Sequence, residues 1–248
     1  MIDLHAHILP GIDDGAYDIH EALNMARMAV KSGVTAIVAT PHCNLPRAKY
    51  VLWSQAVRGE CEKFRQYLKA KSVPLKVYDG MEIFGTRDAP RYLYEGKLHT
   101  INDSRYPLVE FPFFDYAEEA TEILSEFLDM GFQPVVAHPE RYDYVQRMPH
   151  LLNIWSDMGC LLQINRGSLL GRFGERAEAL SHSLLMRDFV TCIASDAHTA
   201  SVRTPWLKDI YAMLSEEYSE HLAERLLMMN PQLILDNKIL NLKEPNWF

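Results

Sequence analysis

Two histidines near the N-terminus, His5 and His7, are the first residues of this 248-residue chain whose types and spacing suit chemistry. Residues two positions apart in a β-strand point to the same face, so both imidazoles would face one site. The loop that follows carries two carboxylates, Asp13 and Asp14. Neutral imidazoles beside carboxylates suit a borderline divalent ion such as Mn, Fe or Zn. A His-x-His pair in a strand more often has no metal-binding role, so the metal interpretation depends on further ligands elsewhere in the chain.

Ligand-type residues recur along the chain at or just past the end of segments with the apolar character of buried strands. Each alone has a structural explanation: His42 beside Pro41 suits a turn, and Glu110 suits a paired core carboxylate. In a β/α barrel, however, the carboxyl ends of the strands converge on one face, where catalytic groups collect. All of these ligand-type residues are unlikely to lie at the same end of successive strands by chance, so we favour a metal site. The further candidates are His42, Glu82, Glu110, His138, Asp196 and His198.

Strand, loop and helix alternate along the chain, which favours a parallel α/β fold. An unbroken series of such units can close into a seven-stranded barrel; the alternative is an open doubly wound sheet, whose dinucleotide-binding Gly-x-Gly-x-x-Gly is absent. The predicted strands are 2–8, 35–40, 75–78, 106–111, 134–137, 160–164 and 190–194. The predicted helices lie between Asp18 and Gly33 and over about 50–71, 117–130, 148–158, 173–187, 203–217 and 219–229, with a helix or loop at 87–97 and a break at Asn230-Pro231.

Composition limits the class of protein. Hydrophobic residues make up 48% of the chain, enough for a sizeable core. No repeat or Gly/Ser linker divides the sequence, so we expect a single domain over residues 1–248. A net charge of −8 without a Lys/Arg run argues against nucleic-acid binding. We expect a cytoplasmic protein that does not insert into a membrane. The cysteines are scattered, the sequence has no signal-like start, and no apolar run is long enough to cross a bilayer.

Six stretches together resemble a known family: MIDLHAHILPGIDDG, VATPH, GMEI, HTINDSRYPLVEF, PVVAHPERY and IASDAH. They span Met1 to His198, so the resemblance covers nearly the whole chain. The pattern is similar to the PHP (polymerase and histidinol phosphatase) superfamily. The IDDG, NDSRY and HPERY elements resemble most closely the manganese-dependent protein tyrosine phosphatases encoded with bacterial capsule and exopolysaccharide genes.

This resemblance implies a distorted seven-stranded (β/α)7 barrel of the PHP type that holds three divalent ions, with Mn²⁺ expected and Fe or Zn as alternatives. Chemistry agrees, because a carboxylate such as Glu82 can bridge two cations and a set of N and O donors without thiolate favours Mn or Fe. The implied ligands are His5, His7, Glu82 and Asp196 for the first ion, Glu82, Glu110 and His138 for the second, and Asp14, His42 and His198 for the third.

The implied reaction is hydrolysis of phosphotyrosine by a metal-activated hydroxide, without a phosphoenzyme. Arg141 in HPERY and Arg203 after the last ligand pair are candidates to clamp the phosphate, since a guanidinium fork matches two phosphate oxygens. Arg203 could equally be a solvated loop residue. The resemblance also implies a partner: the C-terminal tail of a membrane-associated tyrosine kinase that regulates capsule or exopolysaccharide synthesis.

Four alternative functions remain open on the sequence. Cys160 and Arg166 have the C-x5-R spacing of cysteine-based tyrosine phosphatases, although the residues between them have the character of a strand. An amidohydrolase also begins with His-x-His, but it commonly uses a bridging lysine at a strand end, and none is found here. A small-molecule phosphatase, for example of histidinol phosphate, differs only in its substrate. A non-catalytic regulator that binds a kinase tail would keep the metal site without hydrolysis.

Overall fold

A computed structural model describes residues 1–45, 53–240 and 245–248, and in these residues eight strands form two sheets. All the strand pairs are parallel, as the sequence predicts. The three-stranded sheet has the order β1 (Ile2–Ala6), β2 (Ala36–Ala39), β3 (Lys76–Asp79). The five-stranded sheet has the order β4 (Glu82–Phe84), β5 (Leu108–Glu110), β6 (Val135–Ala137), β7 (Leu161–Asn165), β8 (Cys192–Ala194).

The expected seven-stranded barrel is not confirmed, because the chain near Gly80 forms two strands where one was predicted. β3 pairs with β2, whereas β4, which begins after two intervening residues, pairs with β5. A Cβ atom added at Gly80 would lie 2.5 Å from Val38 Cγ1, so only glycine allows the chain to pass this close to β2. The two sheets meet through isolated parallel bridges, His42 to Glu82 and Ala6 to Ala197.

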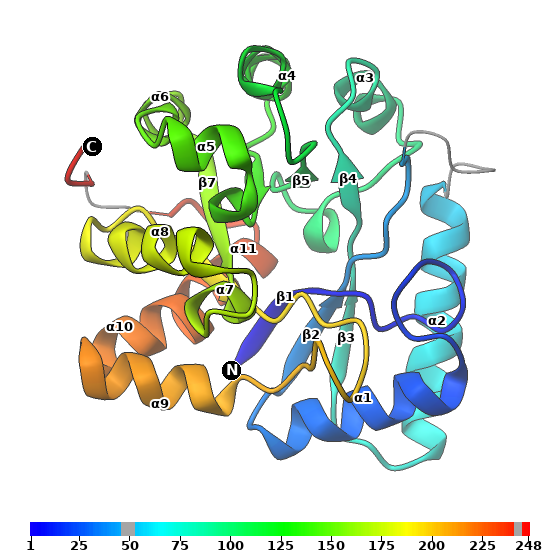
Figure 1. Ribbon diagram of the computed structural model, residues 1–248. Helices are drawn as coiled ribbons and strands as arrows, with labels where there is room; N and C mark the ends of the chain where they lie inside the picture. The colour runs from blue at the N-terminus through cyan, green and yellow to red at the C-terminus, as the bar shows by residue number, and fades with distance from the viewer. Residues whose placement is uncertain (46–52, 241–244) are drawn as a thin grey trace.

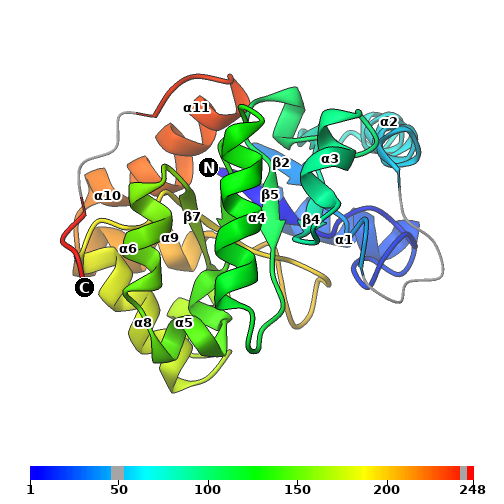
Figure 2. The same ribbon diagram turned by 90° about the horizontal axis from the view of Figure 1, so that it is seen from above.

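Helices surround the two sheets (Figure 1). Seen from above, α4 and α6 stand next to each other outside the five-stranded sheet (Figure 2). Two short helices, α5 and α7, were not predicted, and residues 50–52 of the predicted helix 50–71 lie outside the described residues. The helices are α1 (Ile19–Lys31), α2 (Ser54–Ala70), α3 (Ala89–Tyr94), α4 (Ala117–Asp129), α5 (Asp143–Arg147), α6 (Leu151–Asp157), α7 (Arg166–Leu169), α8 (Glu175–Met186), α9 (Lys208–Glu217), α10 (Glu220–Glu224) and α11 (Asn230–Leu235).

The predicted break at Asn230-Pro231 is wrong, because the helix continues to Leu235. A π-helical turn over Arg225–Met229 joins α10 to α11. Proline lacks an N–H and clashes with the carbonyl four residues earlier in a regular α-helix. The wider π turn immediately before Pro231 changes this hydrogen-bond pattern, so the chain stays helical.

α11 covers the end of the strands opposite to their carboxyl ends. Its Ile234 and Leu235 pack in one apolar cluster with Leu4, Val38 and Leu108 from three strands. The helices on the outside bury a second, larger cluster against the other face of the sheets. The described residues contain no helix with the length and apolar character needed to span a bilayer.

Candidate metal centre

The nine ligand-type residues named from the sequence all lie in four overlapping groups at the carboxyl ends of the strands. Within each group, one ligand atom from every residue lies within 4.8 Å of the others. The groups are His5, His7 and Asp196; His5, Glu82 and His138; His42, Glu82 and Glu110; and His7, Asp14, His42 and His198. The residues come from seven separate segments between positions 5 and 198.

A β-bulge in β1 brings the first two histidines to this centre. Pairing with β2 shifts between Asp3 and Ala6, so Leu4 and His5 both stand opposite Val38. Leu4 packs with Val38 in the inner apolar cluster, whereas His5 Nε2 lies 3.2 Å from His7 Nε2. Strand alternation then places His7 on the same side as His5, as its spacing predicted.

Glu82 occupies the middle of the centre, beside four imidazoles. Its Oε1 lies 3.2 Å from His5 Nε2 and 3.1 Å from His138 Nε2. Its Oε2 lies 3.2 Å from His7 Nε2 and 3.0 Å from His42 Nδ1. Burial alone would raise the pKa of Glu82, but His5 and the other imidazoles lower it well below its usual value. Glu82 is therefore ionised and can bridge neighbouring cations.

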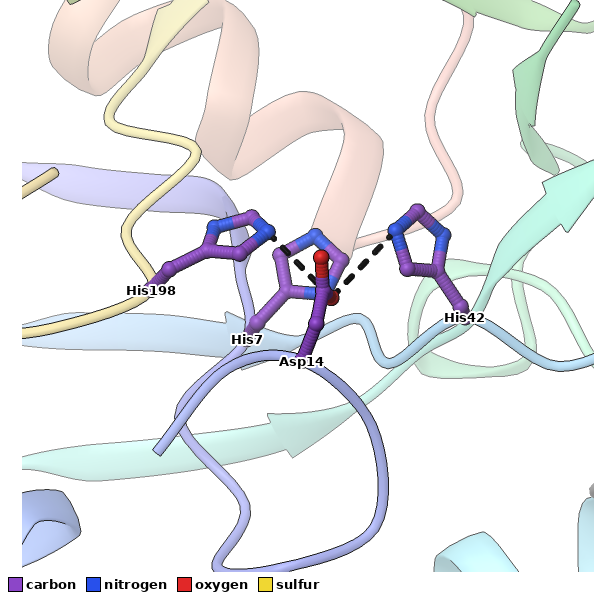
Figure 3. A group of neighbouring side chains, drawn as sticks. All are labelled: His7, Asp14, His42 and His198. Atoms are coloured by element: carbon purple, nitrogen blue, oxygen red, sulfur yellow. Dashed lines mark ion pairs between the residues drawn. The ribbon is translucent and has the colours of Figure 1, made fainter. Parts of the chain in front are cut away.

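Asp14 joins two histidines from distant loops (Figure 3). Its Oδ1 lies 3.4 Å from His198 Nε2 and 3.6 Å from His42 Nε2. The hydrogen bond from His198 lowers the pKa of Asp14. This carboxylate is 65% exposed, so this part of the centre opens to solvent while the Glu82 part is buried.

The donor set fits divalent cations. Neighbouring ligands at about 2.1 Å from an ion are about 3.0 Å apart in octahedral and about 3.4 Å apart in tetrahedral geometry. The nitrogen–oxygen separations at the centre, from 3.0 to 3.7 Å, lie close to these values. Two buried atoms that face each other, His42 Nδ1 and Glu82 Oε2, also have no hydrogen-bond partner. Such atoms are costly unless another group satisfies them, and a cation held between them would do so.

Glu110 and His138 differ electrostatically from the other members. Burial, together with the charge of Glu82, raises the pKa of Glu110 to about 8. Burial lowers the pKa of His138 to about 4. In the metal-free protein near neutral pH, Glu110 therefore keeps its proton and His138 is neutral. A cation that binds here must displace the Glu110 proton, so binding becomes stronger as pH rises.

Three residues outside the predicted ligand set orient the ligands. His5 Nδ1 lies 2.9 Å from Gln163 Oε1, and Gln163 Nε2 donates to Asn165 Oδ1 at 2.9 Å. His7 Nδ1 lies 2.7 Å from Asp13 Oδ2. A proton on each Nδ1 leaves the Nε2 lone pair of both rings for a cation.

Sequence reasoning did not single out Gln163 and Asn165. The available signal was two polar residues in an otherwise apolar stretch, positions 160–165, which the structure places on and beside β7.

Two ligands have left-handed backbone conformations: φ is 37° at His138 and 50° at Asp196. Side chains other than glycine seldom adopt this region, and such residues collect at functional sites. His138 follows directly on β6, and Asp196 follows β8 after one intervening residue, so each turns the chain toward the centre just past a strand end.

Both candidate arginines contact the same oxygen of Asp196. Arg141 Nη1 donates to Asp196 Oδ2 at 3.2 Å, and Arg203 Nη2 donates to the same atom. Arg203 Nη1 also lies 3.2 Å from His198 Nε2. The structure therefore places Arg203 beside the centre rather than in solvent. Its loop is tied to α1 through the Ala200 N–H, which donates to Glu21 Oε1 at 2.7 Å.

The Cys160-x5-Arg166 pair cannot form a phosphate cradle. The five residues of β7 separate the two side chains by about 16 Å or more. Burial raises the pKa of the Cys160 thiol to about 12, so it is not a thiolate. Arg166 Nε donates to Asp209 Oδ1 at 2.8 Å and is held by that ion pair.

Fold and site together define a parallel α/β protein with clustered candidate metal ligands at the strand ends. The family described as "Capsular polysaccharide synthesis, CpsB/CapC" matches residues 1–236, and the chain belongs to this family. The chain is 35% identical to the tyrosine-protein phosphatase YwqE of Bacillus subtilis, over 99% of its own length and 95% of that protein. It is 31% identical to the tyrosine-protein phosphatase CpsB of Streptococcus pneumoniae, over 97% of its length and all of that protein.

Solved structures agree with this assignment. A chain from the crystal structures of YwqE and CpsB, described as "unique metal-dependent tyrosine phosphatases", superposes with a TM-score of 0.94 at 34% identity, over 100% of this chain and 99% of that one. The resemblance to capsule-locus phosphatases is therefore confirmed. An organophosphorus hydrolase from Deinococcus radiodurans matches with a TM-score of 0.58 at 14% identity, over 94% of this chain and 92% of that one, which shows a similar fold only.

Proposed function

We propose that this chain is a metal-dependent protein-tyrosine phosphatase. The observation that carries the proposal is the group of nine nitrogen and oxygen donors with two guanidinium groups at its edge. The names of its relatives, tyrosine-protein phosphatases from two bacteria, support the same substrate.

The proposed cofactor is three divalent ions, Mn²⁺ by preference and Fe or Zn as alternatives, held by the nine residues. When bound, such ions would lower the pKa of water from about 15.7 to about 7 and would offset the charge of the phosphate. The four carboxylates would offset much of the charge of the ions, and Glu82, which lies in two of the groups, would be the bridging one. His42 belongs to two of the groups, with its Nδ1 toward Glu82 and its Nε2 toward Asp14.

In this proposal, the chain's own residues bind the phosphate group and orient the histidine ligands. Arg141 and Arg203 present N–H donors at the edge of the centre, where they would take the phosphate oxygens. Gln163 and Asp13 keep protons on the Nδ1 atoms of His5 and His7. Tyrosinate is a good leaving group, so no strong general acid is required.

The proposal also covers the substrate protein, the cellular compartment and the domain organisation. The substrate would be a phosphotyrosine protein, with the tail of a membrane-associated bacterial tyrosine kinase in capsule or exopolysaccharide synthesis as the specific candidate. Four free, buried cysteines are consistent with a reducing cytoplasm. The bridges at His42 and Ala6 support a single domain in which the two sheets act as one distorted barrel.

The test combines elemental analysis with activity. The purified protein is assayed with a phosphotyrosine peptide and with histidinol phosphate, before and after chelation and again after Mn²⁺ is restored. We expect peptide hydrolysis that chelation abolishes and Mn²⁺ restores, and that thiol alkylation leaves unchanged because the cysteines are buried.

Two results would contradict the proposal. Faster turnover of histidinol phosphate than of the peptide would favour a small-molecule phosphatase. Stoichiometric metal without hydrolysis of either compound would favour a non-catalytic regulator.

A further inference from the structure

A ring from a loop that sequence reasoning did not single out contacts both candidate arginines. The centroid of the Phe173 ring lies 4.2 Å from Arg141 Cζ and 5.7 Å from Arg203 Cζ. Guanidinium groups at such distances are attracted to the face of an aromatic ring. Arg141 Cζ also lies 4.8 Å from the centroid of Phe113, and Phe113 stacks on His138 with centroids 6.0 Å apart.

Phe173 lies between α7 and α8, in a segment fixed at two points. A Cβ atom added at Gly167 would lie 2.6 Å from Phe173 Cε2, so glycine at this position makes room for the ring. Arg172 Nη1 donates to the Val202 carbonyl at 2.9 Å, which ties the segment to the loop of Arg203. The ring is therefore held against both arginines rather than placed there by a freely moving loop.

Both guanidinium groups contact one oxygen of Asp196, so two like charges lie next to each other. One carboxylate oxygen offers too few lone pairs to fix five N–H donors on each group. Arg141 also contacts the Phe113 ring, and Arg203 also contacts His198. The Phe173 ring is a further contact that both arginines share, and it limits the orientations that these long side chains can adopt.

We propose that Phe173 is a positioning residue, whose ring holds Arg141 and Arg203 in the orientation that receives the phosphate group of the substrate. This inference rests on the proposed function, because it assigns the two arginines to phosphate. It adds a residue that touches neither the metal ligands nor, by itself, the phosphate.

The test measures binding of inorganic phosphate to the Mn²⁺-loaded protein, by calorimetry and by Mn²⁺-induced broadening of the phosphate ³¹P resonance. We expect Phe173→Ala to weaken phosphate binding about 5- to 30-fold, the range that loss of cation–π contacts to two guanidinium groups allows. Metal content stays at the wild-type value, and KM for a phosphotyrosine peptide rises by a similar factor. Phe173→Leu, which keeps apolar bulk without a ring, shows the same loss, and Phe173→Trp restores binding.

One further variant serves as a control, and a second one tests whether the position of the Phe173 ring matters. Leu170→Ala removes an apolar side chain that offers no ring to a guanidinium, and it should leave phosphate binding unchanged. Gly167→Ala should weaken binding by displacing the Phe173 ring. In the Phe173→Ala background, Gly167→Ala should have no further effect, because the ring is already absent.

Unchanged phosphate binding in folded Phe173→Ala or Phe173→Leu would overturn the inference, and so would an equal loss in Leu170→Ala. A wild-type protein that does not bind phosphate would overturn it as well. A different result would reject the proposed phosphatase activity. In that case the wild-type protein binds phosphate in a Phe173-dependent way but does not hydrolyse the phosphotyrosine peptide.

Discussion

Side chains at both ends of the parallel strands are buried, but different forces hold the two ends together. In β5, Leu108 is 0% exposed and Glu110, two residues later, is 7% exposed. Leu108 packs against apolar side chains from other strands, whereas Glu110 lies among imidazoles and carboxylates. Burial stabilises the first end through the hydrophobic effect and is unfavourable at the second, where charged groups leave water. The apolar end therefore maintains the fold that keeps the candidate ligands of the polar end together.

The largest expected effect is on activity, from Glu82→Gln at the polar end. The change keeps the shape of the side chain but removes a charge that four imidazoles approach within 3.2 Å. We expect metal content to fall and phosphotyrosine hydrolysis to drop about 10³-fold, the scale at which one catalytic electrostatic group contributes. Elemental analysis and steady-state kinetics measure both, and circular dichroism should show the wild-type fold. Near-normal turnover would contradict the assignment of Glu82.

The converse change, Leu108→Ala, acts on the apolar end. A cavity at a fully buried leucine should lower the free energy of unfolding by about 2–5 kcal/mol, measured by urea denaturation. The folded variant should still bind Mn²⁺ with wild-type stoichiometry. If metal binding is lost while stability is retained, the two ends do not divide these roles.

The pH dependence of stability gives a further test of how the polar end differs from the apolar end. Glu110 in the folded metal-free protein has a pKa of about 8, above that of the unfolded chain, so the folded state binds more protons. The contribution of Glu110 to stability is then greatest at low pH and falls as pH rises toward 8. Glu110→Gln lacks this dependence, so its stability advantage over wild type should grow by about 2 kcal/mol between pH 5 and pH 7. Denaturation of both proteins in chelator measures it, and an advantage that does not change with pH would refute this account.

The smallest effect is expected from Gln163→Leu, which removes the acceptor at His5 Nδ1. Mn²⁺ affinity should fall about tenfold, as for other residues that orient a ligand without binding the ion. Titration of the metal-free protein with Mn²⁺ gives the affinity, and Gln146→Leu, half-buried elsewhere, is the matched control. Equal losses in both variants would mean that Gln163 has no special role.

The candidate metal ligands could be selected from the sequence because their signals are local. Residues two apart on a strand share a face, and a polar residue directly after an apolar run lies at a strand end. These two rules are enough to select His5 with His7, and residues such as His42 and Glu110, without knowledge of the fold. The division near Gly80 and the helical Pro231 were missed, because a close approach to Val38 and a π turn leave no regular period in the sequence.

The chain by itself determined which donor types occur and at which end of each strand they lie, since both follow from neighbouring residues. Only the tertiary structure decided which groups meet. It joins His5 to Gln163 across 158 positions and places Phe173 against two arginines, and it pairs Arg166 with Asp209 instead of Cys160. The physical reason is that such contacts depend on how distant segments pack, and residue spacing along the chain carries no record of that packing.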